Sequence, residues 1–381
     1  MIWLGISSLW CIIAIGIFLL LKHRYATLIP LQPPSPTIAD HPTIAVILPA
    51  RDEAHNIAAC LTSLTNQNYP QEKLHIVVVD DGSRDDTASI AHEFKGQTIR
   101  VDVIEAGDLP SGWLGKSHAC WVGAQYIESE WLCFLDADTR HNPELLSAAV
   151  QQAERDSVDL LSLHPRQEML GFWERLLMPI SFMTLMILLD SRGINAPSSK
   201  KAMANGQFIL VRKNVYDTIG GHAAIRDQIL EDVAIARLVK SSGYKLKLLG
   251  GGSFIHTRMY VRLKTLWEGL ARGGSELFGV PLTSLAVLSA LLGSLFPLAF
   301  PIWRLSVAIE SPDGWLYAST LLAFIGSVAW YGAHARALHT YRVPSYYLFL
   351  LPISNILIAI VNAEGIIRRL RGQRLWKGRT L

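Results

Sequence analysis

The segment LHIVVVDDGS, residues 74–83, is a run of apolar, mostly β-branched residues that ends in two aspartates and a glycine. Such a run is typical of a buried parallel strand followed by a turn. Similar runs recur along the chain, and segments with helical spacing separate them. The expected strands are 43–48, 74–79, 99–104, 131–135, 207–211 and 245–249, and the expected helices are 53–64, 85–94 (beginning at Asp85 or Asp86), 117–127 and 231–241. This alternation predicts a doubly wound α/β sheet with its chemistry at the carboxyl ends of the strands.

Both ends of the chain are apolar, and half of all 381 residues are hydrophobic while only 18% are charged. Ile2–Leu21 carries no charge and is long enough to cross about 30 Å of hydrocarbon. Lys22, His23 and Arg24 follow it directly. A signal peptide has its positive charges before the apolar run, so this order predicts a retained anchor whose C-terminal side is cytoplasmic.

Three further apolar segments, Val280–Trp303, Trp315–Trp330 and Tyr346–Val361, have aromatic residues near their ends, as membrane helices do. The tail beyond them is basic and contains Arg368, Arg369, Arg371, Arg374, Lys377 and Arg379. Four spans would place the C-terminus outside, whereas these charges favour the inside. The alternatives left open are four spans, or one segment that forms a hairpin or lies in the interface.

The expected organisation follows from these patterns. An anchor (1–22) and a Pro-rich linker (23–42) precede a catalytic domain (43–260) that contains an interfacial segment (172–190); an amphipathic connector (261–279), membrane segments (280–363) and a basic tail (364–381) follow. A net charge of +3 gives no sign of nucleic-acid binding. The four cysteines lack metal-ligand spacing and are expected to be reduced. We therefore expect a multi-pass protein of the cell (inner) membrane with a cytoplasmic catalytic domain.

Four acidic clusters follow the expected strands or open a helix: 49–53 (PARDE), 80–83 (DDGS), 136–138 (DAD) and 231–232 (ED). Each alone is as well explained by a cap or a turn. Together on one edge of a sheet they would repel each other, which indicates a cation, a ligand hydroxyl or a base. Asp136-x-Asp138 suits Mg²⁺ or Mn²⁺, and such an ion would neutralise a leaving diphosphate.

In chain order PARDE (49–53), VVVDDGS (77–83), DAD (136–138) and LEDVAIA (230–236) resemble glycosyltransferase family 2, with its GT-A (nucleotide-diphospho-sugar transferase) fold, over residues 43–258. The resemblance implies an inverting transfer of a hexose from a nucleotide-sugar. By the same resemblance Asp232 is the general base with Glu231 beside it, and Asp136 and Asp138 hold a divalent metal and the diphosphate. The residues implied to line the nucleotide pocket are Pro49, Arg51, Glu53, Asp80 and Asp81.

A finer resemblance lies in GWLGKSHAC (112–120) and WKGR (376–379), which are similar to the membrane-bound carotenoid and hopene-associated glycosyltransferases. It implies a polyisoprenoid lipid acceptor, with glucose as the sugar and UDP as the nucleotide. Lys116 would then approach the donor phosphates, helped by amides at the start of the following helix. The alternative for Lys116 is a solvated lysine in a loop. Leu176–Leu189 is expected to be an interfacial or buried helix and to form part of the acceptor entrance.

One departure concerns the segment after the base. Processive polysaccharide synthases carry Gln-x-x-Arg-Trp there, whereas this chain has His256-Thr257-Arg258-Met259-Tyr260. His256 is either a third metal ligand or a loop histidine, and Arg258 is either a diphosphate contact or a membrane-facing arginine. The missing motif disfavours the first alternative function, a polysaccharide or glycan-chain synthase. The second alternative, a non-catalytic membrane scaffold with a sugar-nucleotide fold, is disfavoured because the carboxylates are all present.

Overall fold

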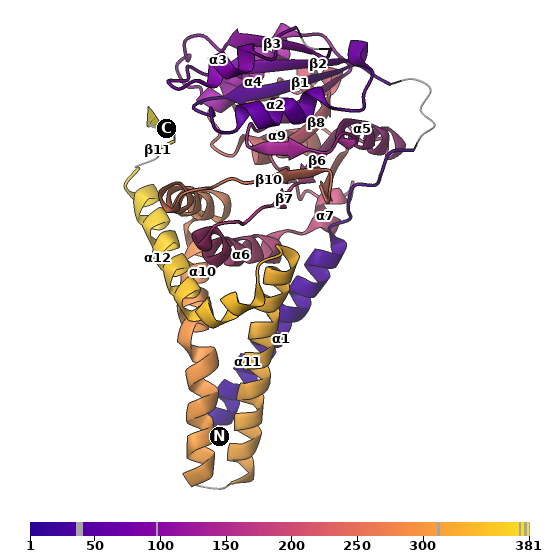
Figure 1. Cartoon of the computed structure of the whole chain (residues 1–381). Coiled ribbons are helices and arrows are strands. Elements are labelled where there is room, and N and C mark those ends of the chain that lie inside the picture. The colour runs from indigo at the N-terminus through magenta and orange to yellow at the C-terminus, as the bar shows by residue number, and fades with distance from the viewer. Residues whose placement is uncertain (36–40, 97, 311–312, 373–374, 377–378, 381) are drawn as a thin grey trace. The chain divides into compact units, whose positions relative to one another are not determined.

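The computed structural model describes residues 1–35, 41–96, 98–310, 313–372, 375–376 and 379–380 (Figure 1). The linker residues 36–40 and the tail residues Arg374 and Lys377 lie outside this range. The chain forms two compact units. The sheet unit comprises 28–168 and 191–259, and the helical unit comprises 1–27, 169–190 and 260–380.

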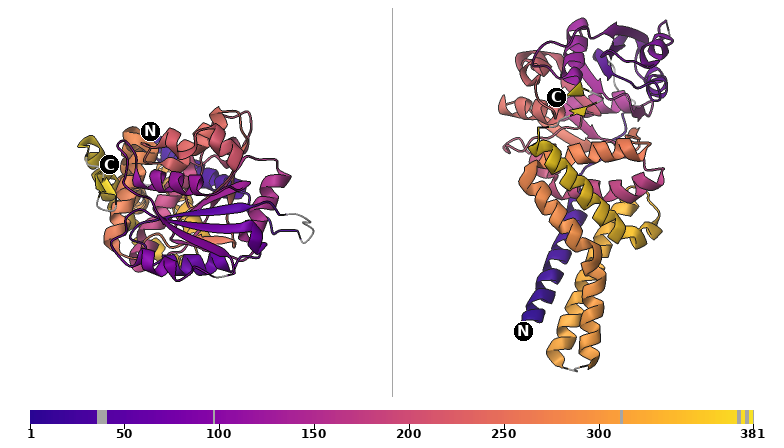
Figure 2. Two further views of the ribbon diagram at one scale, coloured as in Figure 1. Left: turned by 90° about the horizontal axis from the view of Figure 1, so that it is seen from above. Right: turned by 90° about the vertical axis from the view of Figure 1, so that its left-hand side faces the viewer.

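The sheet unit is built on a seven-stranded mixed sheet with the order β3-β2-β1-β4-β8-β6-β9 and helices along both faces (Figure 2, left). All neighbouring strands are parallel except β8, which is antiparallel to both β4 and β6. The strands are β1 Ile44–Ala50, β2 Leu74–Asp80, β3 Arg100–Glu105, β4 Trp131–Leu135, β6 Leu160–His164, β8 Phe208–Arg212 and β9 Leu246–Gly250. The predicted α/β sheet is confirmed, although β6 and the reversed direction of β8 were not predicted.

Short helices connect these strands. They are α2 Ile57–Thr65, η1 Gln71–Lys73, α3 Thr87–His92, α4 Gly115–Tyr126, α5 Leu145–Arg155, α7 Ser191–Asn195, α8 Lys213–Thr218, η2 Gly221–Ile225 and α9 Glu231–Ser241. A second sheet of three short strands has the order β5 (Thr139–His141), β10 (Ile255–Thr257) and β7 (Arg166–Gln167). Because β5 begins just after β4 ends, this small sheet brings residues 255–257 close to the DAD segment.

The order of the strands determines where a ligand can bind. Chain order reverses between β1 and β4, and ligands of open α/β sheets bind beyond the carboxyl ends of the strands at such a switch point. Since β8 is antiparallel to β4, its first residue, Phe208, stands opposite Leu135, the last residue of β4. The turn that leads into β8 therefore lies at the same edge as the residues that follow β1, β2 and β4.

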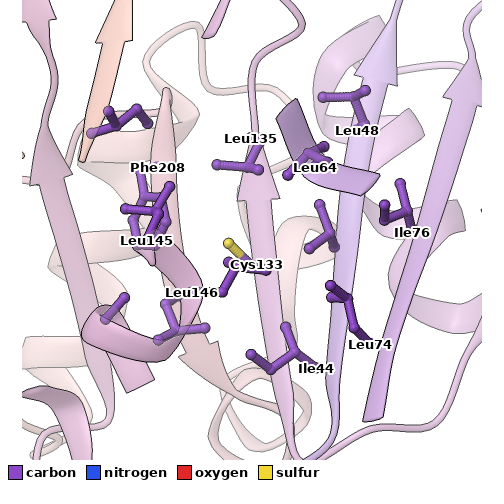
Figure 3. Packing of buried hydrophobic residues seen from close by; sticks show 14 of the residues in the cluster. Ile44, Leu48, Leu64, Leu74, Ile76, Cys133, Leu135, Leu145, Leu146 and Phe208 are labelled. Atoms are coloured by element: carbon purple, nitrogen blue, oxygen red, sulfur yellow. The ribbon is translucent and has the colours of Figure 1, made fainter. Parts of the chain in front are cut away.

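Packing on one face of the sheet explains the spacing of the apolar residues. Ile44 and Leu48 of β1, Leu74 and Ile76 of β2, Cys133 and Leu135 of β4, Phe208 of β8, Leu64 of α2, and Leu145 and Leu146 of α5 interdigitate in one buried cluster (Figure 3). The alternation along each strand matches the two-residue repeat of a pleated strand. All four cysteines are buried and free, in agreement with the expected absence of disulfides.

The helical unit contains α1 (Ile2–Thr27), α6 (Phe172–Leu188), α10 (Leu263–Glu310), α11 (Gly314–Thr340), η3 (Ser345–Leu350) and α12 (Leu351–Leu370). Within it α11 packs against α1 and α10, and α10 also packs against α12 (Figure 1). Among the described residues, four helical segments are long and apolar enough to cross a membrane: 2–27, 263–310, 314–340 and 345–370. Large apolar side chains such as Leu285 and Val328 remain exposed, with fractions of 61% and 71%. Exposed apolar faces of this extent are expected when lipid covers them.

Three details refine the expected organisation. The backbone of α10 breaks at Gly279 (φ 73°, ψ 168°), at the boundary expected between the connector 261–279 and the next apolar segment. Residues 169–190, expected inside the catalytic domain, pack in the helical unit, where Arg24 Nη1 lies 2.7 Å from Asp190 Oδ1. The tail forms two short paired strands, β11 (Leu375–Trp376) and β12 (Arg379–Thr380).

Candidate active site

The loops that follow β1 and β2 are fastened to each other. The Asp81 N–H donates to the Ala50 carbonyl (2.9 Å), and Arg51 Nη1 donates to the Asp81 carbonyl (2.5 Å). Arg51 and Asp81 are both buried, and Arg51 Nη1 lies 3.6 Å from Asp81 Oδ2. Pro49 stands opposite Val79 in the strand register. Pro49, Arg51 and Asp81 thus form one wall at the ends of β1 and β2, and the Arg51 side chain links the two loops. Nucleotide binding by this wall stays a prediction.

Asp80 and Glu53 have local partners. The Ser83 N–H donates to both Asp80 carboxylate oxygens (3.3 and 3.2 Å), and the Ser83 hydroxyl donates to Asp80 as well. Gly82 between them has φ 69°, a left-handed conformation that glycine adopts at no steric cost. Glu53 Oε2 accepts from Asn56 Nδ2 (2.9 Å). Asp80 is therefore a turn former in this structure, one of the explanations that the sequence left open.

Lys116 joins two of the acidic clusters. Its Nζ lies 2.7 Å from Asp136 Oδ1 and 2.6 Å from Glu231 Oε1. Lys116 reaches them from the first turn of α4, Asp136 directly follows β4, and Glu231 opens α9. Its side chain is only 23% exposed. Lys116 is therefore not the solvated loop lysine that was the alternative; it ties the DAD and ED segments together.

The predicted base, Asp232, is oriented by two backbone amides. The Gly206 N–H donates to Asp232 Oδ2 (2.9 Å) and the Val233 N–H donates to Asp232 Oδ1 (2.7 Å). Gly206 belongs to the turn before β8, which the antiparallel pairing brings to this edge. A Cβ on Gly206 would lie 3.0 Å from Lys116 Nζ and 3.2 Å from Glu231 Oε1. The site thus has room for glycine at position 206 and little more.

Three carboxylic groups, those of Asp136, Glu231 and Asp232, lie around the single ammonium of Lys116. Burial would lower the pKa of Lys116, but Asp136 and Glu231 raise it well above its usual range. Burial would raise the pKa of Glu231, but Lys116 outweighs burial and lowers it. Burial raises the pKa of Asp136 despite the same ammonium. Burial and then the Glu231 carboxylate raise the pKa of Asp232 to about 7. One ammonium thus faces three carboxylic groups, and Asp232 still binds a proton at pH values where an ordinary aspartate is ionised.

Asp138 and the segment around His256 meet through the small sheet. Thr139 pairs with Thr257 in antiparallel register, and Thr257 Oγ1 donates to the Asp138 carbonyl (3.2 Å). Asp138 precedes Thr139 and Arg258 follows Thr257, so the register places both at the same end of this strand pair. His256 Nε2 lies 3.8 Å from Glu168 Oε1, and burial lowers the pKa of His256.

The residues expected to hold a metal are Asp136, Asp138 and His256. Among the residues that the structure describes, no group of three or more His, Cys, Asp or Glu side chains is gathered to hold a metal ion. Asp136 is instead engaged by Lys116. The chemistry of the donor set still fits a hard cation, because Mg²⁺ and Mn²⁺ take carboxylate oxygens and leave sites for phosphate oxygens. Asp138 is the carboxylate of this set that lies nearest the His256 strand in register.

Sequence reasoning missed the turn at Asn205–Gly206. Its signal is the Asn-Gly pair directly before the strand expected at 207–211, a typical turn sequence. Asn205 Oδ1 accepts from the Gln207 N–H (3.0 Å), and the Asn205 N–H donates to Ser162 Oγ (2.8 Å). Position 206 gains its importance only from the antiparallel pairing of β8 with β4, which local sequence does not reveal.

The chain is similar to known glycosyltransferases. Residues 45–220 match the family described as Glycosyl transferase family 2. A 4,4'-diaponeurosporenoate glycosyltransferase of Staphylococcus haemolyticus is 31% identical over 241 residues, which cover 61% of this chain and 62% of the relative. The protein of the same name from Staphylococcus aureus (strain MRSA252) is 30% identical over 238 residues, 60% of each chain. The match thus spans less than two thirds of the length of these relatives.

One solved structure shares the fold over nearly the whole chain. It is the mannosyltransferase PcManGT from Pyrobaculum calidifontis, described in complex with GDP-Man and Mn²⁺. Its TM-score is 0.52 at 17% sequence identity, and the match covers 98% of this chain and 100% of the other. Together with the family match, it supports the predicted GT-A fold with apolar helices at both ends.

Proposed function

Since residues 45–220 match glycosyltransferase family 2, we propose that the chain transfers a hexose from a nucleotide-sugar to a polyisoprenoid lipid with inversion at the anomeric carbon. The observation that carries the proposal is the Lys116 bridge between Asp136 and Glu231, with Asp232 held beside it by Gly206. This bridge joins two motifs 95 positions apart into one cluster with surplus negative charge. Such a cluster at the switch point of the sheet suits a reaction that handles a diphosphate and a proton.

The donor side is proposed at the wall formed by Pro49, Arg51 and Asp81. The related fold of the Pyrobaculum calidifontis enzyme, described with GDP-Man and Mn²⁺, supports a nucleotide-sugar and a divalent ion here. We propose UDP-glucose as the donor, with Asp80 and Glu53 shaping the loops around the nucleotide. Lys116, already beside Asp136, is placed to turn toward the diphosphate when a donor arrives.

The divalent ion is proposed to bind Asp138, with Asp136 and His256 as further candidate ligands and Arg258 as a diphosphate contact. One ammonium among three carboxylic groups leaves a negative surplus, which a divalent cation would offset. When bound, the ion would neutralise the charge of the leaving diphosphate. Asp136 becomes available to it if Lys116 moves to the donor.

In the proposed step the acceptor oxygen bonds to the anomeric carbon while the bond from that carbon to the diphosphate oxygen breaks. The electron pair leaves with the nucleoside diphosphate. If the acceptor is a hydroxyl, its proton passes to Asp232, whose pKa of about 7 suits a base that works near neutral pH. Glu231, kept ionised by Lys116, raises the basicity of Asp232. An ionised carboxyl acceptor would not need this proton transfer.

The acceptor is proposed to be a membrane lipid because the similar proteins are named diaponeurosporenoate glycosyltransferases and four helices are apolar enough to span a bilayer. Within the helical unit, α6, α11 and the η3–α12 segment line a mainly apolar pocket. The residues that line it include Ile180, His334 and Leu348. The pocket is small in this structure, so the role proposed for the 176–189 segment in admitting the lipid requires the pocket to widen when a lipid enters. The catalytic domain is proposed to be cytoplasmic, since Lys22 and Arg24 follow the first apolar helix.

The acceptor role of the pocket is best tested at its rim. Leu177 and Met183 are 0% and 4% exposed, so a charge at either position would unfold the helical unit rather than report on the acceptor. Leu348 lines the pocket and is partly exposed, whereas its neighbour Phe349 is 88% exposed. Leu348→Trp should raise the KM for the lipid acceptor without changing the KM for the donor, and Phe349→Trp should change neither. Equal changes in both variants would count against the pocket.

The activity itself is tested with purified protein in nanodiscs. Radiolabelled UDP-glucose and Mn²⁺ are offered with a panel of polyisoprenoid alcohols and acids, and products are separated by chromatography. A single metal-dependent glycolipid supports the proposal. A growing ladder of products would indicate a glycan-chain synthase, and no product with any donor, despite nucleotide binding, would indicate a non-catalytic scaffold.

A further inference from the structure

Lys240 lies inside a ring of backbone carbonyls, away from the catalytic carboxylates. Its Nζ donates to Ile194 O (2.6 Å), Lys201 O (2.7 Å), Ser199 O (3.0 Å), Ala196 O (3.1 Å) and Gly193 O (3.5 Å). An ammonium has three protons, so five oxygens exceed what it can satisfy as a hydrogen-bond donor alone. The arrangement is that of carbonyl oxygens around a cation, as in the carbonyl rings that replace the water shell of K⁺.

The ring is formed by one continuous segment, residues 193–201, and the cation reaches it from another element. Lys240 is in the last turn of α9, the helix that opens with Glu231 and Asp232. No carboxylate among the described residues pairs with Lys240, so its charge is balanced by the carbonyl dipoles. Burial lowers the pKa of Lys240, which agrees with partial removal of its ammonium from water.

The same segment leads directly to the catalytic edge. Within this segment, the Asn195 side chain pairs with the Leu248 backbone through two hydrogen bonds, 3.0 and 2.7 Å long. Downstream, the chain enters the turn whose Gly206 N–H donates to Asp232. Eight residues of helix, about 12 Å, separate Asp232 from Lys240. The two ends of α9 therefore hold the two ends of one chain segment.

We propose that Lys240 is a built-in monovalent cation that orders residues 193–201 and thereby positions the 205–206 turn against Asp232. It is a positioning residue, because its ammonium contacts only the backbone of this segment. The ring it occupies is, by the same argument, a latent site for a free cation of similar size, K⁺ or NH₄⁺, once the lysine side chain is removed. The effect on catalysis rests on the proposed function, whereas the ordering of the segment does not.

The test compares three variants of the full-length protein in nanodiscs. Lys240→Ala opens the ring, Lys240→Met fills it without charge, and Lys200→Ala removes an exposed lysine of the same segment as a control. Amide hydrogen exchange of residues 193–206 is measured in NaCl, KCl, NH₄Cl and choline chloride at equal ionic strength. In NaCl we expect exchange to accelerate about tenfold or more in Lys240→Ala and Lys240→Met and to stay at the wild-type rate in Lys200→Ala. KCl and NH₄Cl should restore protection in Lys240→Ala only.

Sugar transfer is measured in the same salts, and the activity of Lys240→Ala should recover with KCl or NH₄Cl in parallel with protection. Unchanged exchange in Lys240→Ala, or equal recovery in choline chloride, would overturn the inference. If Lys240→Ala loses protection in β1 and β2 as well, it is purified in KCl; failure of KCl or NH₄Cl to restore the fold would also overturn it. If the wild type transfers no sugar but the exchange pattern appears, the positioning stands and the proposed function fails.

Discussion

Lys116 Nζ lies 2.6 Å from Glu231 Oε1, so a lysine at the start of α4 is joined to the residue that opens α9. The same ammonium lies 2.7 Å from Asp136. The Lys116 ammonium therefore joins three segments that are far apart in the sequence, around residues 116, 136 and 231.

Replacing Lys116 should disable the site without unfolding the domain. Lys116→Met keeps the length of the side chain but leaves Asp136 and Glu231 without their shared cation. We expect kcat/KM to fall about 100-fold or more, the scale seen when a charged group at a reacting centre is removed. Steady-state kinetics measure it, with Lys95→Ala, an exposed lysine of the sheet unit, as control. Similar activity in both variants would contradict a role for Lys116.

Gly206 should tolerate no side chain. In Gly206→Ala the new Cβ would lie 3.0 Å from Lys116 Nζ and 3.2 Å from Glu231 Oε1, so the bridge must shift. We expect a loss of activity of about tenfold with a change in Tm of only a few degrees, and a larger loss for Gly206→Val. Gly273→Ala, where no atom lies within 4 Å of the new Cβ, should keep wild-type activity. Full activity of Gly206→Val would show that the bridge is not needed.

Activity with a hydroxyl acceptor should rise with pH through about 7, because Asp232 must lose its proton to act as a base and its pKa is about 7. Stability should change in the opposite sense. An unfolded aspartate has a pKa near 3.8, so protonation favours the folded state, and this contribution is lost as pH rises from about 4 to about 7. Buried histidines such as His222, whose pKa burial lowers to about 4, act the other way over the same range. The measurement is therefore the difference in unfolding free energy between wild type and Asp232→Asn.

The unfolding free energy of the wild type minus that of Asp232→Asn should decrease as pH rises from about 4 to about 7 if Asp232 binds its proton as described. A constant difference from pH 4 to pH 7.5 would mean that Asp232 titrates at its ordinary value. Asp232 would then be ionised at neutral pH, and its protonation could not make the rate depend on pH near 7.

Metal removal should abolish transfer, with recovery in Mn²⁺ or Mg²⁺. Asp138→Asn should raise the metal concentration required for half-maximal activity by about tenfold or more, since an amide is a weaker ligand for a hard cation than a carboxylate. Isothermal titration of Mn²⁺ with UDP present measures the binding without any turnover. Asp108→Asn, an exposed aspartate outside the four clusters, is the control. Unchanged metal dependence in Asp138→Asn would assign the ion to other ligands.

Much of the fold was readable from the sequence because it depends on local patterns. The β-branched run at 74–79 and the apolar run at 131–135 became β2 and β4 within one residue of their expected ends. The helix expected at 231–241 is α9. The strand Leu160–His164 was missed because LLSLH is short and gives little periodic signal.

The sequence identified candidate residues of the site, but it did not reveal which of them contact each other. Acidic clusters at strand ends identified Asp136 and Glu231, but their link through Lys116 arises from tertiary structure. The direction of β8 is likewise set by pairing between distant strands, and it alone brings Gly206 to Asp232. Lys240 carried no sequence signal, since its carbonyl partners are backbone atoms and leave no trace in residue type.

One paired assay tests whether Asp232 is the base for transfer to a lipid hydroxyl. Wild type and Asp232→Asn receive the same radiolabelled donor and Mn²⁺ with a polyisoprenoid alcohol or the matching carboxylic acid, after equal donor binding has been verified. We expect Asp232→Asn to lose transfer to the alcohol by about 1,000-fold or more and to lose transfer to the ionised acid far less. Wild-type rates of transfer to the alcohol by Asp232→Asn would contradict this role of Asp232.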